Sequence, residues 1–102
     1  MAWTVAAKLS DLSEDSAFAV ELGKTSVALY LVEGEVYATS NICTHEFALL
    51  SDGFVEDGFV ECPLHQARFD IISGRALCAP ANEPIATYPA KVENGVVLVD
   101  IQ

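Results

Sequence analysis

The sequence predicts an all-β domain of antiparallel strands, folded as a sandwich or small barrel. The main observation is a set of three two-residue turn signals that end in glycine, Glu33-Gly34, Asp57-Gly58 and Asn94-Gly95. Each separates two segments rich in Val, Tyr, Phe and Ile, which is the pattern of a tight β-hairpin. The second observation is the shortage of helical patterns, since only the segment Leu9–Asp15 has one, over a turn or two.

The first expected strand is "AFAVEL", in which apolar and polar residues alternate in part, as they do in half-buried strands. The three turns then define three further pairs of strands. In chain order, the expected strands are 17–22, 26–32, 35–40, 53–56, 59–62, 88–93 and 96–101. The chain has 102 residues, 52% of them hydrophobic, and contains no repeat or linker. We therefore expect a single domain, 1–102, with one hydrophobic core.

Charge and composition exclude several classes of function. Fifteen acidic and five basic residues give a net charge of -10, which disfavours binding to nucleic acid or to anionic lipid. The longest apolar run, Val27–Val32, is far shorter than the roughly 18 residues of a membrane span. The first residues lack the apolar core of a secretory signal, and three cysteines do not suit the disulfide framework of a secreted domain. These features predict a soluble, cytoplasmic monomer without a nucleic-acid or membrane partner.

Both histidines and two of the three cysteines lie in one short segment. The spacing is Cys43-x-His45, sixteen intervening residues, and then Cys62-x-x-His65. The predicted Asp57-Gly58 hairpin would bring the two pairs together on neighbouring loops. Thiolates are anionic and neutral imidazoles carry no charge, so the four ligands would supply two negative charges.

Three kinds of site suit these residue types. Two cysteines and two histidines form a common structural zinc site. A cysteine beside a histidine also forms a nucleophile pair, although a nucleophile needs only one such pair. The third possibility is a [2Fe-2S] cluster, whose oxidised core of charge +2 would be neutralised by two thiolates. A neutral centre accepts an electron more easily than the dianion formed with four thiolates, so histidine ligands raise its potential.

The motif and its flanks resemble the Rieske iron-sulfur family. "LSDGF", "ECPLHQARFD", "SGRALCAP" and "YPAKVENG" are similar to the Rieske ferredoxins of bacterial aromatic-ring dioxygenases of the naphthalene type. The resemblance covers nearly the whole chain and is weakest over the first 25 residues. It implies a Rieske-type antiparallel sandwich or barrel, with two ligand loops in a cluster-binding part at about 41–82. It also implies one [2Fe-2S] cluster, with Cys43 and Cys62 on one iron and His45 and His65 on the other.

The resemblance further implies an electron carrier rather than an enzyme. Because the cluster uses both histidines, none is left for the two-histidine, one-carboxylate iron site that activates oxygen. No G-x-G-x-x-G follows a strand, so the sequence predicts no nicotinamide or flavin site. The implied partners are an NAD(P)H-dependent flavoprotein ferredoxin reductase and a terminal Rieske non-haem iron oxygenase, in the catabolism of aromatic hydrocarbons. Two alternatives are a redox-inactive, zinc-stabilised Cys2His2 interaction module and a redox sensor.

The Rieske proteins of respiratory and photosynthetic complexes differ from this sequence at four positions. A disulfide clamps their two ligand loops at the positions of Ala48 and Leu64. Ser and Tyr hydroxyls bind the cluster sulfurs at the positions of Ala67 and Phe69. Since hydrogen bonds to sulfur stabilise the more negative, reduced state, their loss predicts a potential near the low end of the range, about -150 mV.

The other residues singled out lie around the two pairs. Cys78 is interpreted as a buried structural thiol, since free cysteine packs like a small hydrophobe. The acids near the pairs are a hypothetical docking surface for a cationic partner. They are Glu46, Asp52, Glu56, Asp57 and Glu61.

Overall fold

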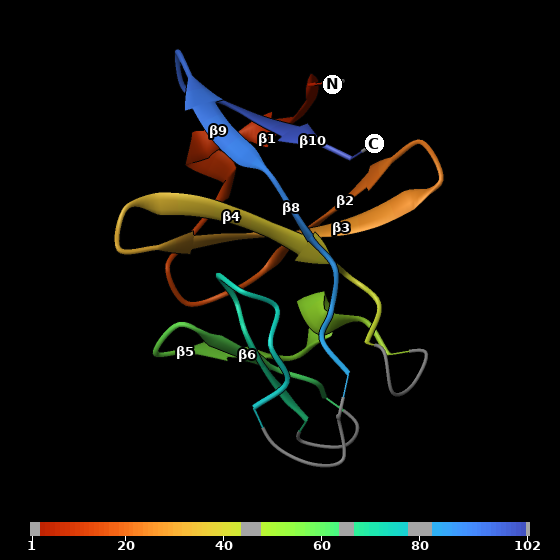
Figure 1. The fold of residues 1–102 in the computed structure, drawn as a ribbon. Coiled ribbons are helices and arrows are strands. Elements are labelled where there is room, and N and C mark those ends of the chain that lie inside the picture. The colour runs from red at the N-terminus through yellow and green to blue at the C-terminus, as the bar shows by residue number, and fades with distance from the viewer. Residues whose placement is uncertain (1–2, 44–47, 64–66, 78–82, 102) are drawn as a thin grey trace.

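The structure is a computed structural model that describes residues 3–43, 48–63, 67–77 and 83–101. Within these ranges the chain forms strands, two short 3-10 helices and no α-helix (Figure 1). All strand pairs are antiparallel and form three sheets. The predicted all-β class is therefore confirmed. No helix in the described ranges has the length and hydropathy needed to cross a membrane.

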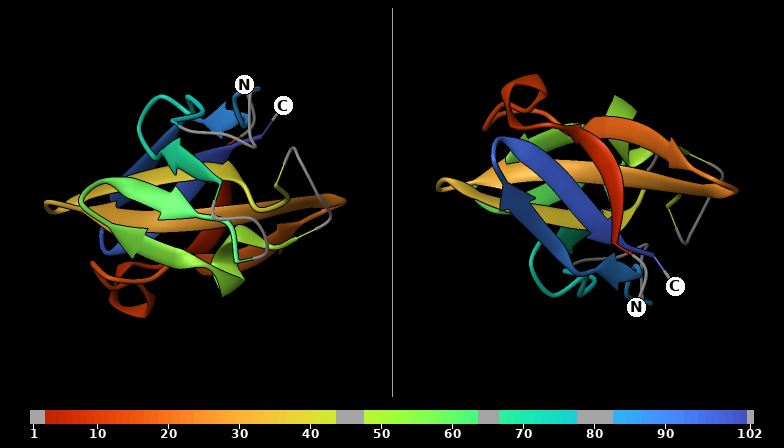
Figure 2. Two further views of the ribbon diagram at one scale, coloured as in Figure 1. Left: turned by 90° about the horizontal axis from the view of Figure 1, so that it is seen from below. Right: turned by 90° about the horizontal axis from the view of Figure 1, so that it is seen from above.

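Two sheets pack together and form the base of the molecule. The first has the order β1-β10-β9 and the second the order β2-β3-β4-β8. Their bounds are β1 Trp3–Lys8, β2 Phe18–Leu22, β3 Thr25–Val32, β4 Glu35–Ser40, β8 Thr87–Tyr88, β9 Ala90–Glu93 and β10 Val96–Asp100. Seen from above in Figure 2, β1, β9 and β10 lie across the long β3–β4 hairpin. Apolar side chains of both sheets form one buried group, which contains Leu22, Val27, Leu29, Val36, Ala38, Val97 and Val99.

The third sheet is inserted in the chain between β4 and β8. It consists of β5 (Phe54–Glu56), β6 (Phe59–Glu61) and β7 (Arg68–Asp70). It lies on the other side of the β3–β4 hairpin, as the view from below in Figure 2 shows. A second buried group joins this sheet to the base, with Tyr30 from β3 and Phe69 from β7 among its largest members.

All three predicted hairpin turns are confirmed. Both residues of each turn have positive φ, with values of 51° and 82° at Glu33-Gly34, 47° and 82° at Asp57-Gly58, and 54° and 76° at Asn94-Gly95. Two-residue turns of this kind match the right-handed twist of the strands, and glycine tolerates the second position without steric cost.

Two predicted elements differ from the structure. The helical segment expected over Leu9–Asp15 is limited to the 3-10 helix η1 (Leu9–Asp11). Ser13 bonds to Asp15 and Ser16 through its side chain, a local pattern that competes with helix formation. The strand expected over 88–93 is divided at Pro89 into β8 and β9, which belong to different sheets. Proline has no N–H to donate to a ladder, so the chain changes sheets there.

Candidate metal centre

Cys43 stands at the end of a narrow ladder that continues from β4. The rungs join Asn41 to Leu50, Ile42 to Leu49 and Cys43 to Ala48. In the last rung, the backbone N–H of Cys43 donates to the carbonyl oxygen of Ala48 at 2.9 Å. We call the segment from Cys43 to Ala48 the first loop. Its two ends are held together by this backbone hydrogen bond, which fixes the main chain of Cys43.

Cys62 has the same setting at the end of the β6–β7 hairpin. Its N–H donates to the carbonyl oxygen of Ala67 at 2.7 Å, directly beyond the pairing of Glu61 with Arg68. We call the segment from Cys62 to Ala67 the second loop. Both loops thus begin with a cysteine whose N–H bonds to the residue five positions later, and in both that residue is a buried alanine. The predicted loop positions of the two cysteines are confirmed.

The two thiols are buried in the same apolar group. Cys43 is 3% exposed and Cys62 is 1% exposed, and the described residues form no disulfide with them. A thiolate in such a place is a buried charge, which proteins keep only where it is paired or bound to a metal. The two cysteines therefore fit a site in which both sulfurs bind the same metal ion.

The remaining members of the predicted site lie outside the described residues. These are His45, His65, the neighbouring Glu46 and Leu64, and Cys78. The assignment of all four ligands, and the interpretation of Cys78 as a buried thiol, stay predictions.

The buried apolar group that contains both cysteines also contains the two positions at which a missing hydroxyl predicts a low reduction potential. Ala67 and Phe69 are both 0% exposed and belong to the same buried group as the two cysteines. Tyr30 lies in that group too, with its hydroxyl 2.9 Å from that of Thr39. Burial raises the pKa of Tyr30 to about 12, an effect that the Thr39 hydrogen bond partly offsets.

The described acids of the predicted docking surface do not form one patch. Glu61 pairs with Arg68 at 2.8 Å, and Asp52 lies in the 3-10 helix η2 (Leu50–Asp52), which follows the first loop. Glu56 and Asp57 lie at the turn end of the β5–β6 hairpin, opposite the end that leads to Cys62. Steering of a partner toward the loops would therefore rely more on Asp52 than on Asp57.

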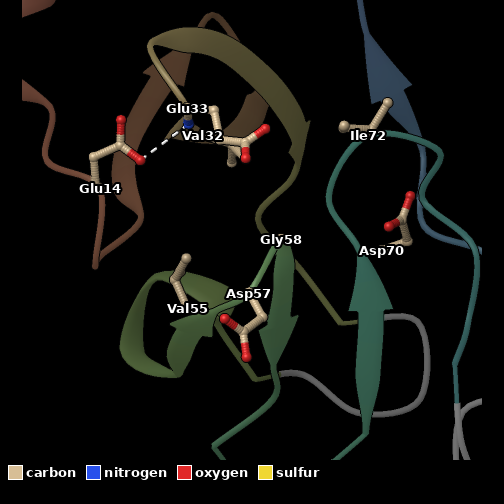
Figure 3. Close-up of a pocket in the computed structure, with 8 residues that line it drawn as sticks. All are labelled: Glu14, Val32, Glu33, Val55, Asp57, Gly58, Asp70 and Ile72. Carbon is tan, nitrogen blue, oxygen red and sulfur yellow. Dashed lines mark hydrogen bonds between the residues drawn. The ribbon is translucent and has the colours of Figure 1, made fainter.

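An acidic cleft of about 570 Å³ separates the base from the third sheet (Figure 3). It contains the carboxylates of Glu14, Glu33, Asp57 and Asp70. Glu14 accepts hydrogen bonds from the N–H groups of Glu33 and Gly34, each at 3.0 Å, and Asp70 accepts two from Ser73. Among the described residues, no three potential ligands gather as a metal ion would require. We assign no ligand to this cleft.

Comparison with known proteins identifies the family. Residues 2–89 match the model of the Rieske [2Fe-2S] domain. The ferredoxin component of the naphthalene 1,2-dioxygenase system of Pseudomonas putida is 50% identical over 99 residues, which are 97% of this chain and 95% of that protein.

Two solved structures have the same fold. A ferredoxin of Sphingomonas yanoikuyae B1 has a TM-score of 0.94 and 36% identity, and the match covers 99% of this chain and 100% of that one. A chain from a complex of reduced oxygenase and oxidised ferredoxin of carbazole 1,9a-dioxygenase has a TM-score of 0.89 and 30% identity, over 95% of this chain and 100% of that one.

These relatives decide between the kinds of metal site. Similarity extends over nearly the whole chain and leads to [2Fe-2S] ferredoxins, so the zinc-module hypothesis has no support. The two buried cysteines at matching loop positions suit the same cofactor. The chain belongs to the Rieske [2Fe-2S] domain family, and its cofactor is one Rieske-type [2Fe-2S] cluster.

Proposed function

We propose that this protein is the ferredoxin component of a bacterial aromatic-ring dioxygenase system, and that it carries single electrons. The observation that carries the proposal is the pair of matching loops, each of which presents a buried cysteine from the same kind of backbone rung. The match over 97% of the chain to the naphthalene dioxygenase ferredoxin component supports the choice of system. The protein is an electron-transfer component and not an enzyme.

We assign the metal ligands as Cys43 and Cys62 on one iron and His45 and His65 on the other. When bound, the cluster accepts and releases one electron. The chain's own contribution is to bury both thiols, to hold them by backbone hydrogen bonds and to surround them with apolar side chains such as Phe69. An apolar, preformed site limits the rearrangement that a change of charge would otherwise require. The cluster-binding part is assigned to about 41–82 of a single domain, 1–102.

The proposed electron acceptor is a terminal Rieske non-haem iron oxygenase. Support comes from the carbazole 1,9a-dioxygenase complex, in which a chain of the same fold is found together with an oxygenase. The proposed donor is an NAD(P)H-dependent flavoprotein reductase, since this chain contains no nucleotide-binding glycine motif of its own. We place the protein in the cytoplasm, because its odd number of cysteines suits a reducing compartment in which thiols stay free or bind metal.

Metal analysis of the purified protein tests the cofactor and its ligands. We expect about two irons and two acid-labile sulfides per chain, as a [2Fe-2S] cluster requires, and a visible spectrum that bleaches on reduction. Cys43→Ser and Cys62→Ser should lose the cluster. Cys78→Ser is the matched control and should keep it. A colourless protein that contains zinc, or full iron content in the Cys43→Ser variant, would contradict the assignment.

Electron transfer to a partner tests the role. The reduced protein is mixed with the terminal oxygenase of a naphthalene-type system, and reoxidation is followed by stopped-flow absorbance. A carrier should be reoxidised as the oxygenase is reduced, and addition of an arene should give product. A redox sensor would leave the oxygenase oxidised.

A further inference from the structure

The short helix η2 is held by one buried residue, Asn41, which lies two positions before the first loop. Asn41, which is 1% exposed, accepts hydrogen bonds from two residues of η2. The main-chain oxygen of Asn41 accepts from the N–H of Leu50 at 2.7 Å, and its side-chain Oδ1 accepts from the N–H of Ser51 at 2.8 Å. The side-chain nitrogen of Asn41 donates to the Ser26 hydroxyl on β3 at 3.3 Å. Through Asn41, η2 is held in place relative to both Cys43 and the base.

Gly53, the residue after η2, lies against the backbone of Glu61, the last residue of β6, directly before the second loop. A Cβ atom at this position would overlap the carbonyl oxygen of Glu61, and it would lie 3.1 Å from the Glu61 carbonyl carbon and 3.2 Å from Cδ of Pro63. These two residues flank Cys62 on either side. The φ of Gly53 is -93°, outside the positive-φ region that favours glycine. Glycine is therefore required here for space and not for its dihedral freedom.

These two contacts link the ligand loops without a covalent bond. Asn41 joins η2 to the segment that leads into the first loop, and Gly53 places the end of η2 directly against Glu61, the residue before Cys62. Because Ala48 occupies one of the two clamp positions of the respiratory and photosynthetic Rieske proteins, that disulfide cannot form in this chain. Any side chain at position 53 would separate η2 from Glu61 and so move Cys62 away from Cys43.

We propose that Gly53 is a positioning residue, which sets the separation of Cys43 and Cys62 by the close approach of its backbone to Glu61, the residue before Cys62, with Asn41 holding η2 to the segment that leads into the first loop. The inference rests on the proposed function, because the separation matters only if the two sulfurs share one iron.

The test compares two glycine variants of the iron-loaded protein, Gly53→Ala and Gly95→Ala. Gly95 is the matched control, because it has a φ of +76° in the β9–β10 turn of the base, where an added Cβ would have no heavy atom within 4 Å. Alanine there strains the backbone without touching either loop. The readouts are the rate of iron release to a chelator, the visible circular dichroism spectrum and the midpoint potential.

We expect Gly53→Ala to release iron at least about tenfold faster than the wild type, in line with losses seen for residues that support metal ligands, and to change the spectrum. Gly95→Ala should release iron at the wild-type rate with the wild-type spectrum. The proposal is overturned if Gly53→Ala behaves like the wild type, or if both variants release iron equally fast.

Asn41 variants keep the proposal testable if Gly53→Ala does not fold. Asn41→Ala removes the acceptor for Ser51 and should also accelerate iron release. Asn41→Asp should restore slow release, since its oxygens accept from the Ser51 N–H and the Ser26 hydroxyl. A wild-type release rate for Asn41→Ala overturns the proposal. If the wild-type protein holds no iron, the proposed function fails instead, so the two failures are distinguishable.

Discussion

Replacing Phe69 with tyrosine adds a hydroxyl next to the metal centre and tests the prediction of a low potential. Phe69 is 0% exposed and belongs to the same buried group as Cys43 and Cys62. In the Rieske proteins of respiratory and photosynthetic complexes, a tyrosine at this position donates a hydrogen bond to sulfur. Such a bond stabilises the more negative, reduced state, so Phe69→Tyr should raise the midpoint potential.

The size of the shift follows from the burial of the site. Because water does not reach Phe69, a hydroxyl placed there does not exchange its bond with solvent. Hydrogen bonds to charged groups contribute about 1.5–3 kcal/mol, and a tenfold change in a one-electron equilibrium, about 1.4 kcal/mol, corresponds to 59 mV. The midpoint potential should therefore rise by roughly 65–130 mV from about -150 mV, and it should remain below about +100 mV. Adding Ala67→Ser should raise the potential further.

Protein-film voltammetry of iron-replete samples measures the shift. Phe54→Tyr is the matched control, because Phe54 on β5 is 63% exposed and its added hydroxyl would be solvated. Its midpoint should equal that of the wild type. An unchanged midpoint for Phe69→Tyr, or an equal rise in Phe54→Tyr, would refute the reasoning.

Two other predictions concern stability and association. Burial raises the pKa of Tyr30 from 10.0 to about 12, so the folded state binds this proton more tightly. The resulting stability, about 3 kcal/mol, is complete below pH 10 and is lost as the pH rises to about 12. Denaturant unfolding at pH 8 and 11 should show about half of this loss, about 1.4 kcal/mol, in the wild type and not in Tyr30→Phe, because pH 11 lies midway between the two pKa values; equal losses in both would contradict it. Separately, the net charge of -10 predicts that reduction by a cationic partner slows as salt is added. Asp52→Asn should weaken this salt dependence more than Asp57→Asn, and stopped-flow rates independent of salt would exclude steering.

The hairpins were predictable because their turns are specified by adjacent residues. Asp57-Gly58 meets the need for positive φ at both turn positions, whatever the rest of the chain does. The pairing of β1 with β10 was not predictable in this way, because Trp3 lies opposite Asp100 and no local pattern identifies so distant a partner. Pro89 carries a local signal that would have divided the expected strand over 88–93, since proline interrupts a ladder.

The same distinction applies to the site. Cys43 and Cys62 could be proposed as ligands from residue type and spacing, because metal ligands belong to a few types of side chain. The proposed positioning roles of Gly53 and Asn41 could not be found in this way. In the sequence Gly53 is only the first residue of the strand expected over 53–56, and the reason for a glycine there is the backbone of Glu61, eight positions later, which comes close only in the folded chain. Asn41 likewise carries no signal in the sequence, because the hydrogen bonds of its side-chain oxygen with Ser51 and of its side-chain nitrogen with Ser26 form only in the folded chain.

The rungs that close both ligand loops consist only of main-chain atoms. Each of these bonds joins residues five positions apart and does not depend on the identity of their side chains. The frame that holds the two cysteines is therefore specified by the path of the backbone, and a substitution can disturb it only through packing, as an added Cβ at position 53 would.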